Sequence, residues 1–512
     1  MNAMHSPSPA PPRLHLSKSR YLAGLQCERR LWLTARRPDL RTPPDAAQQA
    51  LFDQGHRVGE LAHRLFPGGV LVEEGPDRLP EALERTRALL ADPSVPAIFE
   101  AAFVHRDVQV RVDVLERLGR GVFGLREVKA ATEVKPEHLH DVAVQRWVLE
   151  ECGLAVLSVE LVLVDTEFVR PDGPDDAIDW GYLFVREDVS RELGGADALV
   201  PDNVALFHWT LAESDEPEVE PGRHCTQPYA CEFWERCTAA KPADWVFTLP
   251  GVRRPRLVEL DERGIERIAE IPDDVRLSEL QHRARHAVRT GEAWVSRELG
   301  AALRVLEPPA WYLDFEAAMP AVPVWPGTRP YEQVPFQWSL HHRAADDTLT
   351  QQSFLAEGDS DPRRAFAESL IEALGDDDAP VVVWTSYEDT RLKALMEALP
   401  ELAPALQRLR HRLVDLYAVT RAHVYHPEFR GSFSIKRVAP ALAPGFGWSG
   451  LGDVAEGGAA AAAFAELARG GMPPEHAERI RRELLAYCER DTLAMVEVHR
   501  ALREMAGRVE RP

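Results

Sequence analysis

The segment VQVRVDV at residues 108–114, followed by VFGLREVKA at 122–130, decides the fold of the first half of the chain. Valines alternate with polar residues in the first segment, which predicts a strand that is buried on one face. Asp113 lies on the polar face of this strand, and Glu127 and Lys129, two residues apart, share one face of a second strand. We therefore expect two neighbouring strands to present these three side chains to one cleft, where the carboxylates can bind Mg²⁺ or Mn²⁺.

The order of these three residues resembles the D-x(n)-E-x-K pattern of the PD-(D/E)XK nuclease superfamily. E-x-K alone is a weak motif, because a surface salt bridge produces it equally well. A predicted helix at 137–151, EHLHDVAVQRWVLEE, strengthens the resemblance, since Gln145 stands where the RecB-like branch carries the glutamine of Q-x-x-x-Y, with Leu149 in place of the tyrosine. The resemblance implies a restriction-endonuclease-like α/β domain in which Gln145 joins the catalytic site and Lys129 steadies the attacking water or the scissile phosphate.

Three of the six cysteines are clustered in HCTQPYACEFWERC at 224–237, with C-x5-C-x5-C spacing. In a reducing cytosol, clustered cysteines indicate a metal or redox site before a disulfide. The alternative is a set of small buried side chains. Four thiolates suit either zinc or an iron–sulfur cluster, and the lack of paired C-x2–4-C motifs favours the cluster. Cys152 and Cys488 lie in apolar helical contexts and are expected in the core.

The cysteines, taken together with Asp113, Glu127 and Lys129, resemble the RecB-like iron–sulfur nucleases. This group includes the CRISPR-associated RecB-like exonucleases and the AddB nuclease domain. In that group one cysteine precedes the nuclease core and three follow it, so that a cluster staples the two ends together. This chain has the same order. The resemblance implies that a [4Fe–4S] cluster is bound by four ligands: Cys27, Cys225, Cys231 and Cys237.

The chain departs from that group at one position. The group usually has a metal-binding histidine in a helix before the catalytic strands, within a G-x-x-V-H-like pattern. Here GHRVGELAHRLF places Gly59 at that position, with Glu60 next to it and His63 one helical turn later. Either side chain can substitute as a ligand, and a role on the helix surface is at least as plausible.

A second constellation lies in the C-terminal half. The strand predicted in PAWYLDFEAA at 309–318 carries Asp314 and Glu316 on one face. The helix predicted in LLAYCERDTLAMVEVHRAL at 484–502 places Tyr487 and Asp491 one turn apart. Buried paired carboxylates repel one another and normally persist where cations neutralise them. Between them, VVVWTSYEDTRLKAL predicts a strand that ends in an acidic turn.

This D-x-E, acid, Y-x-x-x-D order resembles the DEDDy exonucleases of the DnaQ-like, RNase H-fold group. The resemblance implies an RNase H-like domain in which carboxylates hold two metal ions and a tyrosine orients the nucleophilic water. The second motif is normally an aromatic residue followed by Asp, and here Tyr387 precedes Glu388, with Asp389 as the alternative. The resemblance carries over to these positions: Asp314, Glu316, Glu388, Tyr487 and Asp491. Asp415 is expected behind the site, and Lys436 either contacts phosphate or has a surface or capping role.

The second half is also similar, over most of its length, to an uncharacterised bacterial family that fuses a RecB-like half to an RNase H-like half. The similar segments are DFEA, GTRPYEQVPFQWSLH, RLVDLY, GSFSIKRVAPAL and YCERDTLAM. We therefore expect four parts: a disordered N-terminus at 1–12, the PD-(D/E)XK domain at 13–240, a helical connector at 241–308 and the RNase H-like domain at 309–508.

Composition limits the class of protein. The 512 residues carry a net charge of −22, and no stretch approaches the ~18 apolar residues of a membrane span. The N-terminus is Ser/Pro-rich without an apolar core, so we expect neither a signal peptide nor an anchor. We therefore expect a cytoplasmic location. The negative charge argues against indiscriminate coating of nucleic acid, but it permits a local basic groove, and residues 13–41 are rich in arginine.

Lysine is scarce, with only six among the sixty basic residues. Lysine is a compact charge whose pKa is easily tuned, which suits it to catalysis, whereas arginine suffices for solubility. A compositional bias would leave the lysines at arbitrary positions. They are Lys18, Lys129, Lys135, Lys241, Lys393 and Lys436.

The sequence thus predicts a metal-dependent nuclease with two active centres that acts on DNA in repair, recombination or defence. The second centre is expected to trim ends, with 3′ to 5′ polarity favoured. The alternatives are a catalytically degenerate nucleic-acid-binding scaffold and a nuclease directed at RNA. No G-x-x-x-x-G-K-[ST] motif occurs, so any helicase is expected to be a separate partner.

Overall fold

The computed structural model describes residues 15–452 and 457–509. The expected disordered segment at 1–12 lies outside these residues. The chain forms two compact units. The first unit comprises residues up to 43, 53–168 and 173–239, and the second comprises 44–52, 169–172 and the chain from 240 onward.

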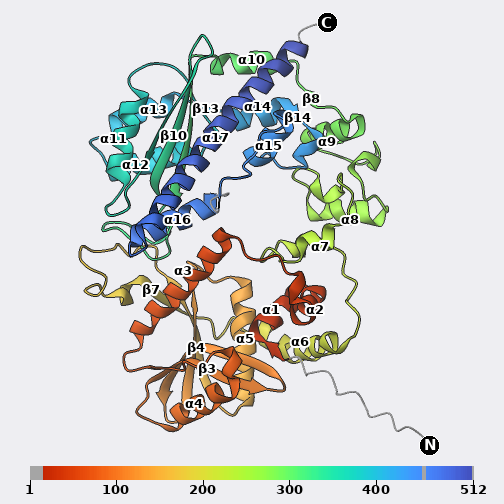
Figure 1. The fold of residues 1–512 in the computed structure, drawn as a ribbon. Coiled ribbons are helices and arrows are strands. Elements are labelled where there is room, and N and C mark those ends of the chain that lie inside the picture. Colours follow the sequence, from red (N-terminus) through yellow and green to blue (C-terminus); the bar gives the residue numbers. More distant parts are fainter. Residues whose placement is uncertain (1–14, 453–456, 510–512) are drawn as a thin grey trace, which may run out of the picture. The chain divides into compact units, whose positions relative to one another are not determined.

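The first unit is built on one mixed sheet (Figure 1). The strands follow the order β2-β3-β4-β5-β6-β7, and β1 pairs with β4 outside this path. The strands are β1 (Leu16–Ser17), β2 (Val70–Leu71), β3 (Ala97–His105), β4 (Val108–Gly119), β5 (Val122–Lys129), β6 (Ala155–Val164) and β7 (Phe184–Asp188). The predicted strand at 108–114 is confirmed within β4, where the valines are buried and the alternating polar residues are partly exposed.

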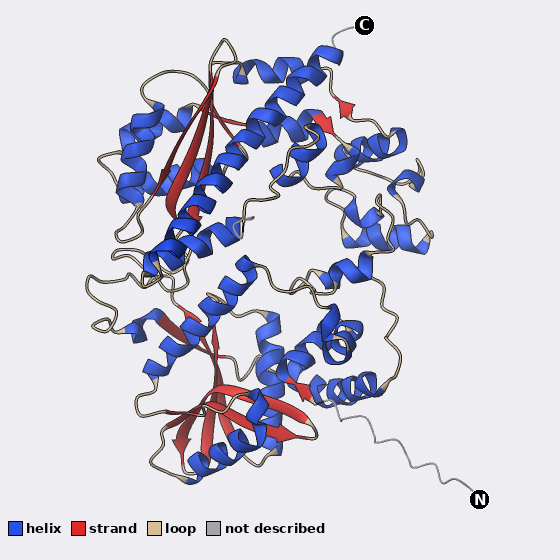
Figure 2. Ribbon diagram, in the orientation of Figure 1, coloured by secondary structure: helices blue, strands red, loops and turns tan. Residues whose placement is uncertain are grey.

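Helices cover the sheet of the first unit (Figure 2). They are α1 (Lys18–Gln26), α2 (Glu28–Arg36), α4 (Leu79–Ala91), α5 (Pro136–Glu151), α6 (Gly194–Ala212) and α7 (Trp234–Thr238), and α3 (Ala46–Ala62) has residues in both units. The helix predicted at 137–151 is confirmed as α5, which packs on β3, β4, β5 and β6. Cys152 was expected in the core, and this expectation is wrong: it is the exposed residue that caps the C-terminus of α5.

The second unit contains a five-stranded mixed sheet in the order β11-β10-β9-β12-β13, so that β9 is the central strand. β9 pairs antiparallel with β10 and parallel with β12. The strands are β9 (Ala310–Ala318), β10 (Val334–Arg343), β11 (Leu349–Leu355), β12 (Val381–Val383) and β13 (Leu413–Asp415), and β8 (Trp294–Val295) pairs with β14 (Val424–Tyr425) in a separate ribbon. The strand predicted at 309–318 is confirmed as β9.

Helices lie on both faces of this sheet (Figure 1). One face carries α11 (Arg363–Leu374), α12 (Tyr387–Ala398) and α13 (Ala403–His411), and the other carries α16 (Gly457–Arg469) and α17 (Pro474–Val509). The shorter helices are α8 (Arg254–Glu262), α9 (Glu279–Thr290), α10 (Leu299–Leu303), α14 (Leu416–His423) and α15 (Ile435–Leu442). Because side chains alternate along β9, Trp311, Leu313 and Phe315 pack against the first group of helices. Asp314 and Glu316 therefore lie on the face covered by α17.

The segment at 241–308, expected as a helical connector, contains short helices and the strand β8, and it contributes to a core shared with the rest of the second unit. Leu260, Ala284 and Leu303 are buried in the same cluster as Val498 and Leu502 of α17. The segment therefore forms part of the second unit's packing and not a free-standing linker.

Both units are mixed α/β structures, as the sequence predicted at the level of fold class. Across residues 15–452 and 457–509, none of the helices combines the length and the apolar character that a membrane crossing requires.

Candidate active sites and cysteine pocket

The first carboxylate cluster lies where β4, β5 and α5 meet in the first unit. The backbone N–H of Val128 donates to Asp113 Oδ2 at 2.8 Å. Lys129 Nζ donates to Glu127 Oε1 at 2.7 Å, and Gln145 Nε2 donates to Glu127 Oε2 at 2.7 Å. The structure therefore brings together the four residues that the sequence predicted for the catalytic site of this unit.

Two further residues complete this cluster, and sequence reasoning did not assign them to it. Asp141, one turn before Gln145 on α5, accepts from Lys129 Nζ at 2.5 Å and from Gln145 Nε2 at 3.0 Å. Lys18, the first residue of α1, lies 2.9 Å from Glu127 Oε1 and 3.4 Å from Asp141 Oδ1. The scarcity of lysine was the only sequence signal for Lys18.

The charges of the first cluster are strongly coupled. Burial raises the pKa of Asp113 to about 7, and the neighbouring Glu127 adds to this increase. Burial opposes ionisation of Glu127 as well, but Lys129 and Lys18 hold its pKa well below the usual range. Burial alone would lower the pKa of a lysine, yet the carboxylates raise the pKa of both Lys18 and Lys129. The cluster is thus a buried network of ion pairs.

The residues considered in place of the missing histidine are only partly near this cluster. Glu60 is exposed on α3. His63 stacks on Phe99, with ring centroids 3.9 Å apart, and burial lowers its pKa while Glu100 and Glu60 oppose that change. Glu100, a residue of β3 with φ 56°, also raises the pKa of Asp113. His63 is therefore linked to the cluster through Glu100.

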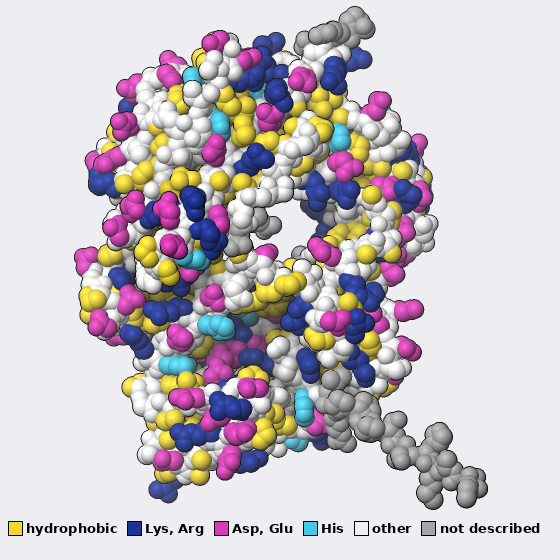
Figure 3. All heavy atoms as spheres, in the orientation of Figure 1, with side chains coloured by type: hydrophobic (Ala, Val, Ile, Leu, Met, Phe, Trp, Pro, Cys, Tyr) yellow, Lys and Arg dark blue, Asp and Glu magenta, His cyan; other side chains and the backbone are white. Residues whose placement is uncertain are grey.

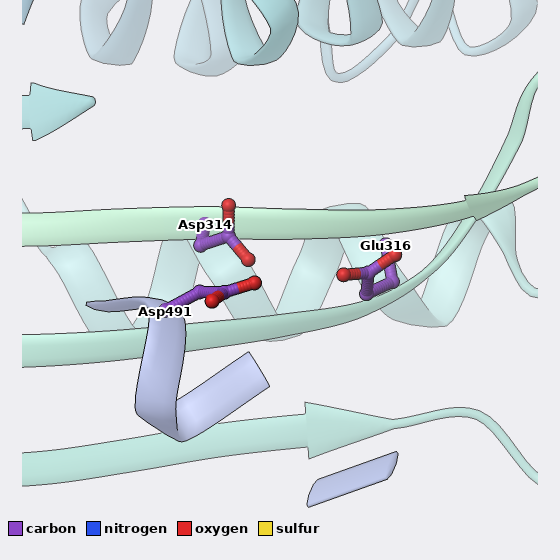
Figure 4. Close-up of side chains that lie close together, drawn as sticks. All are labelled: Asp314, Glu316 and Asp491. Carbon is purple, nitrogen blue, oxygen red and sulfur yellow. The ribbon is translucent and has the colours of Figure 1, made fainter. Parts of the chain in front are cut away.

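The second carboxylate cluster joins β9 to α17. Asp314, Glu316 and Asp491 each offer one oxygen, and these oxygens lie within 4.8 Å of one another. Figure 4 shows Asp491 reaching from α17 toward Asp314, with Glu316 farther along the strand. Among the described residues this is the one group of three or more acidic, histidine or cysteine side chains with such spacing. The geometry suits a divalent cation with oxygen ligands.

Neighbouring side chains hold the second cluster in place. Trp448 Nε1 donates to Asp491 Oδ1 at 2.5 Å, and Tyr487 hydrogen-bonds to the same aspartate. The buried Cys488 thiol donates to Asp314 Oδ2 at 3.5 Å. Lys436 of α15 lies over the Tyr487 ring, 4.8 Å from its centroid. Sequence reasoning did not identify Trp448, which lies outside the acid motifs, or the role of Cys488, which occupies an unspecified position within Y-x-x-x-D.

The first turn of α12, which follows β12, distinguishes Glu388 from Asp389. Glu388 is buried. Among the described residues it forms no ion pair, and its Oε2 has no hydrogen-bond partner. Asp389 instead accepts from Arg410 Nε at 2.8 Å and pairs with Lys393 at 2.6 Å. Asp415 accepts from the backbone N–H of Thr385, which holds the turn from behind.

The carboxylates of the second cluster resist ionisation. Burial, reinforced by neighbouring carboxylates, raises the pKa of Asp314, Glu316 and Glu388 well above the usual range. Burial also raises the pKa of Asp491 to about 6, although the hydrogen bond from Trp448 opposes the increase. Several buried carboxylates this close together repel one another at neutral pH unless a cation neutralises them. The residues therefore fit Mg²⁺ or Mn²⁺.

The four predicted cluster ligands, Cys27, Cys225, Cys231 and Cys237, line one pocket in the first unit. Backbone N–H groups donate to three of the sulfurs: those of residues 29 and 30 to Cys27, that of residue 222 to Cys225 and that of residue 233 to Cys231. Burial raises the pKa of these three thiols and the N–H donors oppose that change, while Arg29 and Arg30 also line the pocket. The donor set therefore fits a thiolate-bound, negatively charged group.

The arginine-rich stretch near the N-terminus does not form a free basic surface in the described residues. Arg29 pairs with Glu216 at 2.5 Å, and Arg30 pairs with Glu232 at 2.9 Å. Arg36 donates to the backbone carbonyl of residue 211. Figure 3 shows acidic and basic side chains interspersed over the visible face of each unit. These arginines thus stabilise the N-terminal fold around the cysteine pocket.

Comparison with known proteins gives one match. A family model described as a domain of unknown function (DUF2779) matches residues 311–434, about a quarter of the chain. The matched segment contains Asp314, Glu316 and Glu388 and ends before Tyr487 and Asp491. No curated protein and no solved structure matches the chain.

Proposed function

We propose that this protein is a metal-dependent nuclease that hydrolyses phosphodiester bonds in DNA at two active centres. The observation that carries the proposal is the convergence of Asp314, Glu316 and Asp491, whose oxygens lie within 4.8 Å of one another. Two of these residues come from the central strand of the sheet and one from the C-terminal helix. Such buried acids are unfavourable without bound cations, so the arrangement is best explained as a metal site.

At the second centre, Asp314, Glu316, Glu388 and Asp491 would hold Mg²⁺ or Mn²⁺. When bound, the metal supplies charge neutralisation and an activated water. Trp448 fixes the orientation of Asp491, and Tyr487, hydrogen-bonded to that aspartate, would orient the nucleophilic water. This centre would remove nucleotides from a strand end, with 3′ to 5′ polarity favoured.

At the first centre, Asp113 and Glu127 would hold the divalent ion, and Lys129 would contact the scissile phosphate or the attacking water. Gln145 donates to both Glu127 and Asp141, so it fixes the rotamers of both carboxylates. Its Oε1 is buried without a partner among the described atoms, which leaves an acceptor for a water molecule at the site. This centre would also cut phosphodiester bonds.

We also propose a fold family for each unit and a cofactor for the cysteine pocket. The first unit would be a PD-(D/E)XK domain of the RecB-like type, and the second an RNase H-like domain of the DnaQ type. The central position of β9 and the packing of α17 against it support the second assignment. The cysteine pocket would hold a [4Fe–4S] cluster. Within the described residues no three of its sulfurs lie within 4.8 Å of one another, whereas tetrahedral zinc requires about 3.8 Å.

The expected partner is nucleic acid, with DNA favoured over RNA, in repair, recombination or defence against foreign DNA. A helicase would be a separate protein. The second candidate, a scaffold that binds nucleic acid without cutting it, is favoured by Gly59, which stands in place of the usual metal-binding histidine, and by Glu388, which replaces the shorter aspartate of the second motif.

Cleavage of end-labelled single- and double-stranded DNA and RNA with Mn²⁺ or Mg²⁺ tests the proposal. Wild type is compared with Asp113→Ala, Asp314→Ala and the double variant, and Asp389→Ala, which removes an ion-paired carboxylate outside both sites, is the control. We expect each single variant to lose a distinct set of products, the double variant to lose all cutting, and the control to behave as wild type. Absence of cutting by cluster-loaded wild type, with binding retained, would favour the scaffold.

A further inference from the structure

Lys18 occupies a rigid position at the edge of the first carboxylate cluster. The preceding residues, Leu16 and Ser17, form β1 and pair with β4. Ser17 caps α1 by accepting from the backbone N–H of Arg20, and the buried Tyr21 packs against Phe207. Lys18 therefore starts its helix at a point fixed on both sides, unlike a mobile surface lysine.

The contacts of Lys18 are directed at the carboxylates of the site. Its ammonium group lies 2.9 Å from Glu127 Oε1 and 3.4 Å from Asp141 Oδ1. Lys129, two residues after Glu127 on β5, contacts the same oxygen of Glu127 at 2.7 Å. Two ammonium groups thus share one carboxylate oxygen, although the proposed chemistry requires only one lysine.

The balance of charges gives this second lysine a role. With every group ionised, three carboxylates at the first site face two ammonium groups, which leaves a net charge of −1; these groups belong to Asp113, Glu127, Asp141, Lys18 and Lys129. The nearby Glu100 adds no net charge, because Arg111 pairs with it at 3.0 Å. One divalent ion would bring the site to +1, which one phosphodiester group neutralises. Two divalent ions would bring it to +3.

The second site has a different balance. Three of its carboxylates face Lys436, and the fourth, Glu388, lies near Asp314. Together these five ionised groups leave −3, so two divalent ions are needed to reach the same +1. The carboxylates are those of Asp314, Glu316, Glu388 and Asp491.

We infer that Lys18 is a positioning residue that takes the place of a second divalent cation, so that the first centre binds one metal ion. The inference rests on the proposed nuclease function and specifies the metal content of its first centre. Lys18 acts through Glu127 and Asp141, whose oxygens it holds together as a second ion would.

Counting bound Mn²⁺ by electron paramagnetic resonance tests this inference. The full-length, cluster-loaded chain carries Asp314→Asn and Asp491→Asn as background, so that the second site does not contribute. Asp113→Asn in that background gives the number of ions bound elsewhere on the acidic surface. Mn²⁺ prefers oxygen ligands, so the cysteine pocket does not interfere.

We expect one Asp113-dependent ion in the background protein, two in Lys18→Met and one in Lys18→Arg. Arg20→Met, which removes a cation from the same helix without touching the carboxylates, should also leave one. Two ions in the background protein, a count that stands without any Lys18 variant, would overturn the inference, as would one ion in folded Lys18→Met. No Asp113-dependent ion at all would instead contradict the metal-dependent function itself.

Discussion

Glu388 and Asp389 are adjacent, yet the structure gives them opposite surroundings, which makes them a matched pair for mutagenesis. Glu388 is buried near Asp314, and Asp389 is neutralised by Arg410 and Lys393. We expect Glu388→Gln to reduce cleavage by the second centre by about 10²-fold or more, because a ligand charge is lost. Asp389→Asn should change the rate less than about twofold. Equal losses in both variants would contradict the assignment of Glu388.

Asp314 allows a test that does not require activity. Burial and Asp491 raise its pKa well above the usual range, so the folded state binds the proton more tightly than the unfolded state. The metal-free protein therefore loses stability as the pH rises above the unfolded pKa of about 3.9. At pH 7 we expect Asp314→Asn to raise the melting temperature of metal-free protein by at least about 2–4 °C, which corresponds to roughly 1 kcal/mol.

Mn²⁺ should stabilise the wild type more than this variant, as scanning calorimetry would show. Asp389→Asn should instead lower the melting temperature, because Arg410 lowers the pKa of Asp389 and the charge of this carboxylate stabilises the fold. A lower melting temperature for metal-free Asp314→Asn would mean that the carboxylate is not under electrostatic strain.

At the residue scale, periodicity paired side chains on one element, the family resemblances joined side chains from different elements, and residues covered by neither were missed. Glu127 and Lys129 could be paired because strand residues two apart share a face. Lys18 could not, since 109 positions separate it from Glu127 and only the pairing of β1 with β4 brings it near. Trp448 was missed for the same reason: it reaches Asp491 from a loop without any motif.

At the scale of single elements, α17 contains a pH-sensitive contact away from the carboxylates. His499 and Tyr312 of β9 share a hydrogen bond of 2.7 Å, and burial, aided by Arg343 and Arg503, lowers the pKa of His499 to about 4. The pKa of His499 in the folded state lies below the unfolded value of about 6.5. The contribution of neutral His499 to the free energy of unfolding is therefore present above pH 6.5 and is lost as the pH falls toward 4.

We expect the second unit to lose up to about 3 kcal/mol of stability between pH 6.5 and 4 from this residue. Denaturant unfolding of wild type and His499→Gln at both pH values measures the effect. The variant should be less stable at pH 7 but lose less on acidification. An identical pH dependence in both proteins would show that His499 is not the group that titrates.

Long periodic elements were predictable, and their ends were not. The alternation in β4 and the helical spacing in α5 and α17 matched the structure, because one buried face determines each pattern. Cys152 was misplaced because the apolar helix before it ends one residue earlier, which leaves the thiol exposed. The segment at 241–308 has weak periodicity, so the sequence did not indicate which core its short helices join.

At the scale of the whole molecule, we expect the two units to respond differently to loss of the iron–sulfur cluster. The cysteine pocket joins the start of the first unit to its end, so we expect iron removal to unfold the first unit while the chain from about residue 240 stays folded. Limited proteolysis after chelation, followed by mass spectrometry, should give a resistant C-terminal fragment.

Cys27→Ser should behave like the chelated protein and lose the broad absorbance near ~400 nm that iron–sulfur clusters show. Cys152→Ser, which removes an exposed thiol outside the pocket, is the matched control and should retain the band. Stoichiometric zinc without iron in the purified protein, or full protease resistance after iron removal, would contradict the cluster.

Helix α1 connects two of the features described above, since it starts at Lys18 in the carboxylate cluster and ends at Gln26, just before Cys27 in the pocket. Each helical residue advances the chain by 1.5 Å and turns it by about 100°. One residue inserted or deleted between these two positions would therefore rotate Lys18 away from Glu127 while Cys27 stayed in place. The interval K-x8-C is thus a fixed length, and homologous chains that share this site should show no gaps within it.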